Sequence, residues 1–430
     1  MNPLALTATI ILSFLVLLLP RRQAAIPLIL AACYLTLGQQ IVIFSLNFTI
    51  LRIIIFFGWI RILLRKELYE IKINALDKLM VWWVIVAIVT GVFLIKTFGG
   101  FINRMGFAYN TLGLYFFFRA TVSDFEDVDY IIAVLAVIVF PLAVIMVHEK
   151  LTGHNIFSIF GGVPEVSAVR NGRLRCQGPF RHPILAGTFG ATLMPLMVGQ
   201  WLKGGRSRLI DLMGIIGATV ITVTPSSSGP AVAYCFVTIG MLMWPLRDRM
   251  RIVRRALLIG ILSLHFIMKA PVWFLIARLS ELIGGTGYHR SKIIDQAIRY
   301  FNEWWLVGTT YTAHWMPYVL PNNPKMTDIT SQYIGQAVDG GIGRLILFIL
   351  IIIRAFRNVG EALHSFDEED FGNRILCWAI GVSLLGHTVS FISVAYFDQI
   401  IVFWYLLLSM IASLPNSNAS EPKVSNLEGD

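Results

Sequence analysis

Long apolar runs, separated by polar connections, make up most of the chain. A helix of roughly 20 apolar residues can cross the hydrocarbon core of a bilayer. The runs predict helices over residues 4–19, 24–44, 48–64, 79–95, 106–118, 131–147, 184–202, 209–223, 231–245, 256–268, 345–353, 375–393 and 400–414. We therefore expect an all-α fold, a polytopic transmembrane bundle of about 12–13 spans that forms a single domain over residues 1–414.

Two polar intervals, 148–183 and 271–343, are much longer than the other connections. Long connections in compact domains are usually functional. Lysine and arginine collect on the cytoplasmic side of membrane proteins. If the turn at Arg21 and Arg22 is cytoplasmic, strict alternation places the following basic connections inside as well: 61–78, 203–208, 247–255 and 354–374. Both long intervals then face outward, and residues 415–430 form a polar, disordered cytoplasmic tail.

The interval 271–343 contains an amphipathic pattern typical of a helix. In HRSKIIDQAIRYFNEWWLVG, apolar side chains recur at spacings of three and four, at Ile293, Ile294, Ala297, Ile298, Phe301 and Trp305. We expect this short helix to lie along the outer surface of the membrane. Arg299 has Asp295 and Glu303 four residues away, which predicts an ion pair along the helix. Arg290 has no such neighbour, so it is the better candidate for binding a ligand.

Composition supports the membrane assignment and narrows the function. Hydrophobic residues make up 56% of the sequence, charged residues 14%, and the mean hydropathy is +0.71, values typical of a membrane protein. The net charge of +10 is explained by arginines on the cytoplasmic face, so we expect no nucleic-acid partner. Cys33, Cys176, Cys235 and Cys377 are scattered, and no pair of carboxylates has metal-ligand spacing on the outer face. We expect neither a disulfide framework nor a metal site.

The interval 148–183 is unusually basic for an outer loop. It carries Lys150, Arg170, Arg173, Arg175 and Arg181 against only Glu149 and Glu165. Two explanations stay open. Anionic lipid head groups, or a topology fixed by neighbouring helices, would tolerate these charges. Alternatively, arginine side chains bind a phosphate-bearing substrate through two-point contacts at the outer surface.

Four segments resemble, in their order along the chain, motifs of bacterial O-antigen ligases and of O-antigen and exopolysaccharide polymerases. They are GRLRCQGPFRHPILAGTFGATLMPL, TVTPSSSGPAVAYCF, HRSKIIDQAIRYFNEWWLVGTTYT and DITSQYIGQAVDGGIGRLILFIL, and together they cover residues 173–350. The resemblance implies a GT-C-like glycosyltransferase that inverts the anomeric centre without a metal or other cofactor. It further implies a polyprenyl-diphosphate-linked oligosaccharide as donor, a glycan as acceptor, and an active site on the periplasmic face of the bacterial inner membrane.

The sequence departs from the family pattern at several motif positions. His182 stands where the family has asparagine before a proline, and Ser227 and Ser228 stand where it has arginine. Aligned on Tyr333, Thr330 replaces the family histidine. Asp328 and His314 are then the nearest groups that can take up a proton, although His314 is equally well explained as an interfacial residue. We expect Arg290, Asp328 and His314 to be catalytic, and Arg175, Arg181, His182 and Tyr333 to bind substrate.

A lipid-linked glycan flippase or secondary transporter, which makes no covalent bond, is the alternative of a different class. Transporters usually carry internal repeats and charged groups near the midplane. No convincing repeat is found, but Lys96, Arg104 and Arg119 flank one apolar run and keep this alternative open. Among enzymes, a ligase that transfers glycan to lipid A core competes with a polymerase, which the Ser-Gln-Tyr sequence at 331–333 favours. Membrane lipids and a chain-length regulator are further expected partners.

Overall fold

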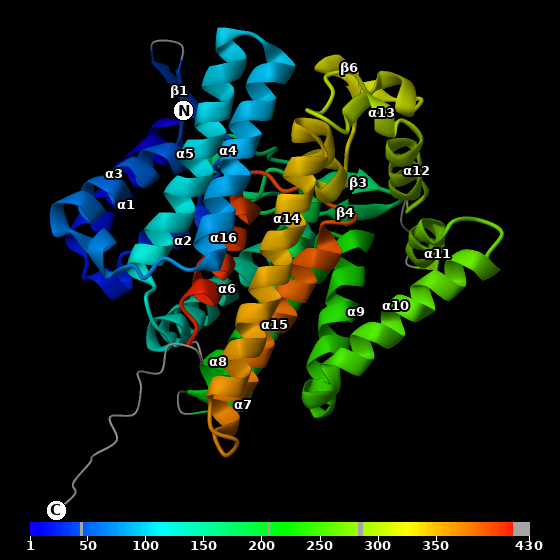
Figure 1. Cartoon of the computed structure of the whole chain (residues 1–430). Coiled ribbons are helices and arrows are strands. Elements are labelled where there is room, and N and C mark those ends of the chain that lie inside the picture. The colour runs from blue at the N-terminus through cyan, green and yellow to red at the C-terminus, as the bar shows by residue number, and fades with distance from the viewer. Residues whose placement is uncertain (44–45, 205–206, 283–286, 416–430) are drawn as a thin grey trace, which may run out of the picture.

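The computed structural model describes residues 1–43, 46–204, 207–282 and 287–415, and it consists mostly of helices (Figure 1). The α-helices are α1 (Pro3–Leu18), α2 (Ile26–Tyr34), α3 (Ile50–Arg65), α4 (Ala75–Ile95), α5 (Phe98–Thr121), α6 (Phe125–Thr152), α7 (Pro183–Lys203), α8 (Arg208–Val223), α9 (Ser228–Leu242), α10 (Met250–Ile267), α11 (Leu275–Leu282), α12 (Gly287–Arg299), α13 (Phe301–Trp304), α14 (Gln332–Ser365), α15 (Phe371–Ser390) and α16 (Gln399–Ala412). The predicted tail, from residue 416 onward, lies outside the described residues.

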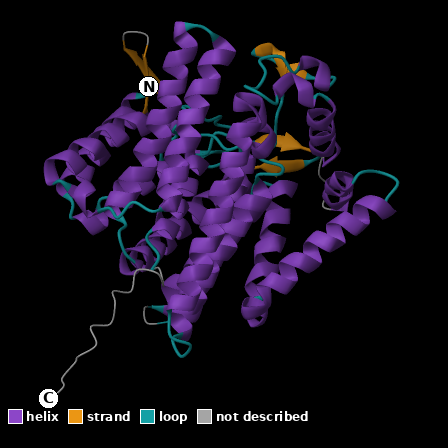
Figure 2. Ribbon diagram, viewed as in Figure 1, coloured by secondary structure: helices purple, strands orange, loops and turns teal. Residues whose placement is uncertain are grey.

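Short strands pair as three antiparallel hairpins. They are β1–β2 (Gln40–Ile43 with Leu46–Thr49), β3–β4 (Ala168–Arg170 with Arg173–Arg175) and β5–β6 (Val319–Leu320 with Asn323–Thr327). Figure 2 shows β1–β2 and β5–β6 at the upper end of the molecule and β3–β4 lower, above the start of α9. Hairpins β3–β4 and β5–β6 belong to the intervals 148–183 and 271–343, and residues of both intervals line one cavity.

Four of the described helices, α4, α6, α7 and α14, are long and apolar enough to cross a membrane. A fifth crossing results if α9 and the segment Trp244–Ile267, which bend by 80°, form one broken span. This is fewer than the predicted set of spans, because several apolar runs form shorter helices. The run 24–44, for example, is helical only to Tyr34, after which the Gln39 amide donates to the carbonyl of Phe160 at 2.6 Å. The prediction of one helix over 24–44 is wrong.

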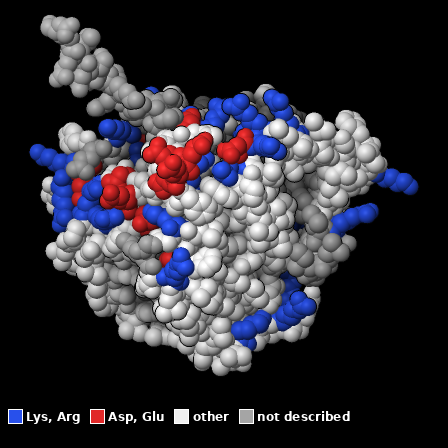
Figure 3. All heavy atoms as spheres, turned by 90° about the horizontal axis from the view of Figure 1, so that it is seen from below, with Lys and Arg blue, Asp and Glu red and all other residues white. Residues whose placement is uncertain are grey.

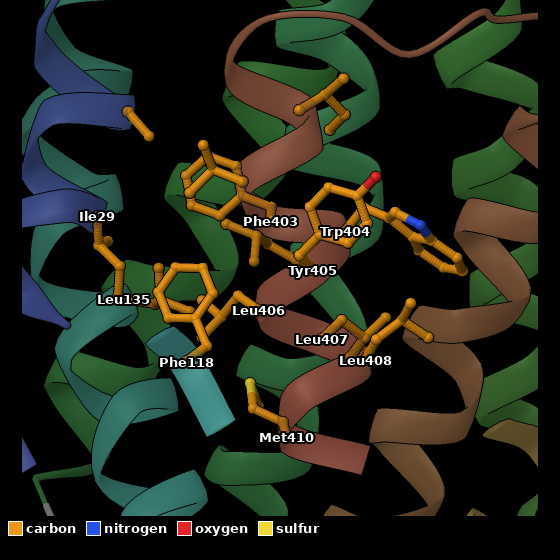
Figure 4. Close-up of a cluster of buried hydrophobic side chains, with 14 of the residues drawn as sticks. Ile29, Phe118, Leu135, Phe403, Trp404, Tyr405, Leu406, Leu407, Leu408 and Met410 are labelled. Carbon is orange, nitrogen blue, oxygen red and sulfur yellow. The ribbon is translucent and has the colours of Figure 1, made fainter. Parts of the chain in front are cut away.

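The helix α16 lies in the centre of the bundle. It has 14 residues, which is short for a span, and all of them except Ile401 are buried. Figure 4 shows its side chains packed against residues of several other helices, among them Ile29, Phe118 and Leu135. A helix that is apolar on every side is stable only when neighbours surround it. The apolar run at 400–414 is thus explained by protein packing as much as by lipid.

Buried ion pairs hold helix ends together on the opposite side from the hairpins. Arg119 on α5 pairs with Asp77 on α4 at 3.0 Å, and Asp77 also caps the first turn of α4. Arg61 on α3 pairs with Glu67 at 2.8 Å and donates to the carbonyl of Val16 at the end of α1. Arg119 therefore has a structural partner.

Figure 3, which views the molecule from below, shows charged side chains gathered beside a wide uncharged area.

A kink interrupts α14 at its two consecutive glycines. Gly341 has a φ of 72°, and a side chain there would collide with the carbonyl of Leu306, 2.3 Å from the Cβ position. The amide of Ile342 donates to the carbonyl of Trp305 at 2.8 Å, so the loop after α13 packs directly on the kink. The Gly-Gly-Ile-Gly sequence is therefore a bend within a helix that begins at Gln332, before the predicted apolar run 345–353.

The predicted amphipathic helix is broken after Arg299. α12 ends there, α13 follows, and the indole of Trp304 folds back to donate to the carbonyl of Ala297 at 2.7 Å. Ala297 and Trp304 are buried, whereas Phe301 and Trp305 are exposed, contrary to the single apolar face expected. The ion pair predicted for Arg299 is also absent among the described residues. Its expected partner Asp295 pairs with Lys292 at 3.6 Å, and Glu303 accepts hydrogen bonds from His314 and Trp315.

Candidate functional site

A polar cavity of about 890 Å³ lies at the hairpin end of the molecule, within the size range of small-molecule sites. It is enclosed by hairpin β3–β4, the start of α7, the α8–α9 connection, the start of α12 and the segment after β6. We call it the arginine pocket. Its lining residues are Arg170, Asn171, Arg173, Arg175, His182, Ile184, Thr222, Val223, Ser226, Ser227, Ser228, Ala231, Tyr234, Cys235, His289, Arg290, Asp328 and Thr330.

Hairpin β3–β4 presents three of the four arginines. Its turn is Asn171–Gly172, with φ values of 51° and 70°, which is the residue pair that a tight hairpin turn prefers. Arg170 pairs with Arg173 across the strands, and Arg175 lies two residues further along β4. Alternation along the strand places residues 173 and 175 on the same face. The hairpin thus concentrates positive charge on one side of a short ribbon.

Two consecutive residues at the end of α6 anchor this hairpin. The buried carboxylate of Glu149 accepts from the Ser167 hydroxyl at 2.7 Å and from the amides of Gln177 and Gly178 at 2.9 and 2.8 Å. The Lys150 ammonium donates to the carbonyl of Leu174 at 2.7 Å and to the Ser226 hydroxyl at 2.8 Å. Lys150 therefore ties β4 to the α8–α9 connection, and Glu149 closes the base of the loop.

Arg290 enters the pocket from the opposite side, at the start of α12. Its guanidinium lies 3.5 Å from the Ser228 hydroxyl, and no carboxylate pairs with it among the described residues. Burial, together with the positive charges of Arg170 and Arg175, lowers the pKa of Arg290. The pKa of Arg175 is lowered by burial and by Arg170. The guanidinium groups therefore repel one another, and an anion bound between them would relieve this repulsion.

His182 is a neutral donor at the edge of the pocket. As the N-cap of α7, it accepts the amide hydrogen of Ile184 on Nδ1 at 3.1 Å, so the ring proton of the neutral form is on Nε2. Burial and the charges of Arg175 and Arg170 lower its pKa to about 4. His182 can therefore donate a hydrogen bond to a ligand without carrying charge at neutral pH.

Asp328 and His289 are the proton acceptors that line the pocket among its described residues. Asp328 is exposed, directly after β6, and its main-chain carbonyl is 3.1 Å from Nε2 of His289. A carbonyl oxygen can only accept, so Nε2 of His289 carries the hydrogen and Nδ1 is left as an acceptor. The described lining residues include four arginines and one carboxylate. The site therefore suits a ligand that carries an anion near a hydroxyl group, because the arginines can bind the anion and Asp328 can accept the hydroxyl proton.

One wall of the pocket is apolar and belongs to the helices below it. Ile184, Val223 and Ala231 line this side, and the Tyr234 hydroxyl is 2.8 Å from that of Thr219 across the gap between α9 and α8. Val223 is 66% exposed on the outer surface of α8. The pocket thus joins a cationic end to an apolar side, which suits a ligand with a charged head and an apolar chain.

The structure brings four of the seven predicted site residues together, namely Arg175, His182, Arg290 and Asp328. Three lie elsewhere. Arg181 is 61% exposed and pairs with Asp398 at 3.5 Å. His314 pairs with Glu303 at 3.0 Å, and the Tyr333 hydroxyl donates to the carbonyl of Thr388 at 3.1 Å. The pocket lining does not include Arg181, His314 or Tyr333. Each of these side chains contacts a partner outside the pocket instead.

Several pocket residues were not singled out from the sequence. Arg170 and Arg173 were noted only as excess charge, although the Asn-Gly turn between them marks a hairpin. His289 adjoins Arg290, and no sequence pattern distinguishes it. Ser226 follows a proline and has a φ of 50°, which the sequence does not indicate. The positions of these residues depend on contacts between distant segments.

A scan against protein-family models finds no match, and no curated protein matches the chain by sequence. Within the described residues, no group of three His, Cys, Asp or Glu side chains is arranged to hold a metal ion. The arginine pocket is therefore the feature from which a function is inferred.

Proposed function

We propose that the chain is a membrane glycosyltransferase that polymerises polyprenyl-diphosphate-linked repeat units. One observation carries the proposal: four arginines from two separate segments line one cavity, together with apolar residues and, among the described residues, one carboxylate. A lipid diphosphate has the matching parts, an anionic head between a sugar and an apolar chain. The resemblance of residues 173–350 to O-antigen ligases and polymerases points to the same substrate.

In the proposed reaction, a hydroxyl oxygen of the acceptor glycan attacks the anomeric carbon of the donor from the side opposite the diphosphate. The bond between the anomeric carbon and the diphosphate oxygen breaks, and the electron pair leaves with the polyprenyl diphosphate. Asp328 takes the proton of the attacking hydroxyl. Arg175 and Arg290 stabilise the negative charge on the leaving group, as preorganised donors do in other group transfers. Inversion follows from the direction of attack.

The same proposal includes the surroundings of the enzyme. We place the arginine pocket on the periplasmic side of a bacterial inner membrane, in a polytopic helical bundle whose shorter apolar helices also lie within the bilayer. The acceptor is a second lipid-linked glycan, and a chain-length regulator is a further expected partner. A ligase would use the same donor site and differ only in its acceptor.

The test uses purified protein in lipid nanodiscs supplied with lipid-linked repeat units. The expected result is a ladder of longer lipid-linked glycans on gels, with one polyprenyl diphosphate released for each added unit, as mass spectrometry would show. Transfer to lipid A core without a ladder would indicate a ligase. Movement of intact lipid-linked glycan across proteoliposomes, with no new glycosidic bond, would overturn the enzymatic proposal in favour of a flippase.

A further inference from the structure

Two exposed tyrosines lie on either side of β6, the strand that leads to Asp328. The amide of Thr312 donates to the carbonyl of Lys325 on β6 at 2.9 Å, which places Tyr311 beside the strand. On the other side, the Thr327 hydroxyl donates to the carbonyl of Tyr318 at 2.8 Å. The side chains of Tyr311 and Tyr318 are 52% and 76% exposed. Exposed apolar surface beside polar groups can mark a binding site.

The ring of Tyr311 is fixed in place. It stacks on His314 at 5.1 Å between centroids and 16° between planes. His314 is held in turn by Glu303, whose two carboxylate oxygens accept from His314 at 3.0 Å and from the Trp315 indole at 3.2 Å. Tyr300 stacks on Trp315 at 6.1 Å and 10°. This network gives His314 a structural role and fixes the orientation of the Tyr311 ring, so that a ligand stacking on the ring would lose little conformational freedom of the protein.

Hairpin β5–β6, which directly follows Tyr318, carries exposed polar side chains. Asn322, Asn323 and Lys325 on hairpin β5–β6 are all exposed. A surface that combines aromatic rings with amides and an ammonium matches a sugar ring, which presents C–H groups on its face and hydroxyls around its rim. Lys325 and Asp328 are three positions apart, about 10 Å along an extended strand. A disaccharide can span that distance.

We infer that the surface formed by Tyr311, Tyr318 and β6 is a glycan track that binds the acceptor chain and presents its terminal hydroxyl to Asp328. The inference rests on the proposed function for its role in transfer, but binding to the track requires neither donor nor catalysis. Sugar rings stack on the tyrosines, and the amides of the hairpin hydrogen-bond to their hydroxyls. The donor occupies the arginine pocket at the other end of the strand.

The test measures glycan binding first. Fluorescent maltohexaose, cellohexaose and chitohexaose are titrated against the full chain in nanodiscs without donor, because stacking depends on ring faces more than on linkage. At least one probe should bind, and the double variant Tyr311→Ala with Tyr318→Ala should raise its Kd about tenfold or more. Tyr69→Ala is the matched control, since Tyr69 is 88% exposed on the segment Glu67–Glu70 before α4. This control should leave binding unchanged.

The second measurement separates the track from the proposed function. In the polymerisation assay the double variant should make shorter chains and need more acceptor for half-maximal transfer, whereas Tyr69→Ala should change neither. If the double variant loses probe binding and the wild type also never transfers sugar, the track is supported and the proposed function is refuted. Wild-type chain length and probe affinity in the double variant, or binding of none of the three probes, overturns the track and leaves the proposed function standing.

A membrane contact would give a different result. Tyr318→Trp places a fluorescent ring on the same surface, and brominated phospholipid in the nanodisc quenches only indoles that touch the acyl region. No quenching beyond that of the wild-type tryptophans is expected. Strong additional quenching would show that this surface lies in lipid, and it would overturn the glycan track.

Discussion

Replacing Arg290 tests the central electrostatic argument. Arg290 is half-buried beside Arg170 and Arg175, and no described carboxylate neutralises it. If it stabilises a leaving diphosphate, Arg290→Ala removes a charged donor that acts most strongly when the glycosidic bond breaks. Arg290→Lys keeps the charge but loses the planar two-point geometry, so it should recover only part of the activity.

The expected magnitude follows from the surroundings of the side chain. One charge pair about 4 Å apart contributes about 4 kcal/mol at an effective dielectric constant near 20. Solvent entering the open pocket and repulsion from the two neighbouring arginines reduce this gain. Loss of one preorganised donor commonly costs about a hundredfold in rate, which corresponds to about 2.7 kcal/mol. We expect Arg290→Ala to lose about a hundredfold or more in the rate of transfer.

The assay follows polyprenyl diphosphate release from lipid-linked repeat units, with Arg299→Ala as the control. Arg299 is on the same helix and is exposed outside the pocket, so this variant should keep nearly full activity. Folding is checked by thermal unfolding, and pyrophosphate should stabilise the wild type and the control more than Arg290→Ala. A wild-type rate in Arg290→Ala, or inactivity of the Arg299 variant alone, would refute the placement of the site.

Three further changes are expected to affect the pocket in different ways. Asp328→Asn should slow transfer by about 10²–10⁴-fold while strengthening pyrophosphate binding, because it removes a base and a negative charge together. The pKa of His182, lowered to about 4, means that transfer should show no titration of this residue above about pH 5. The unfolded histidine takes up its proton at about pH 6.5, well above the folded pKa of about 4. The unfolded state therefore gains stability relative to the folded state as the pH falls from about 6.5 to about 4. His182→Asn should remove this part of the acid sensitivity in unfolding measurements. Cys235 is exposed in the pocket, whereas the other three cysteines are buried. A membrane-impermeant maleimide should label Cys235 from one side of the membrane only, the periplasmic side if the proposed orientation holds, and lipid-linked substrate should slow that labelling.

The sequence predicted most helices because their apolar runs are long and continuous. Runs such as 184–202 and 209–223 correspond closely to α7 and α8. The prediction failed where apolar composition alone was used to set the length of a helix. Within the run at 24–44 the helix ends at Tyr34 and a strand follows at Gln40–Ile43, and α16 is apolar although protein surrounds it. Hydropathy does not distinguish burial in protein from burial in lipid.

The candidate site was predictable only in part, and the reason is physical. Arg290 was proposed because it has no residue of opposite charge one helical turn away, and Arg175 and Arg181 because they belong to a basic loop that resembles a family motif. His314 was proposed as a group that can take up a proton. Asp398 and Glu303, however, pair with Arg181 and His314 in three dimensions. Glu303 lies 11 residues before His314 and Asp398 is 217 residues from Arg181. Spacing along a helix reveals neither pair.

The arginine pocket also explains why the loop 148–183 is anchored so firmly. Like charges held close together destabilise the folded chain, so a hairpin that carries arginines needs firm attachment to the rest of the protein. Glu149 and Lys150 provide this attachment by binding both ends of the hairpin segment to α6, which is itself 28 residues long. The arginines then stay close together in the folded protein, and a bound anion lowers the free energy by relieving their mutual repulsion. A ligand with two negative charges should gain more from this arrangement than a monoanion, and that difference favours a diphosphate.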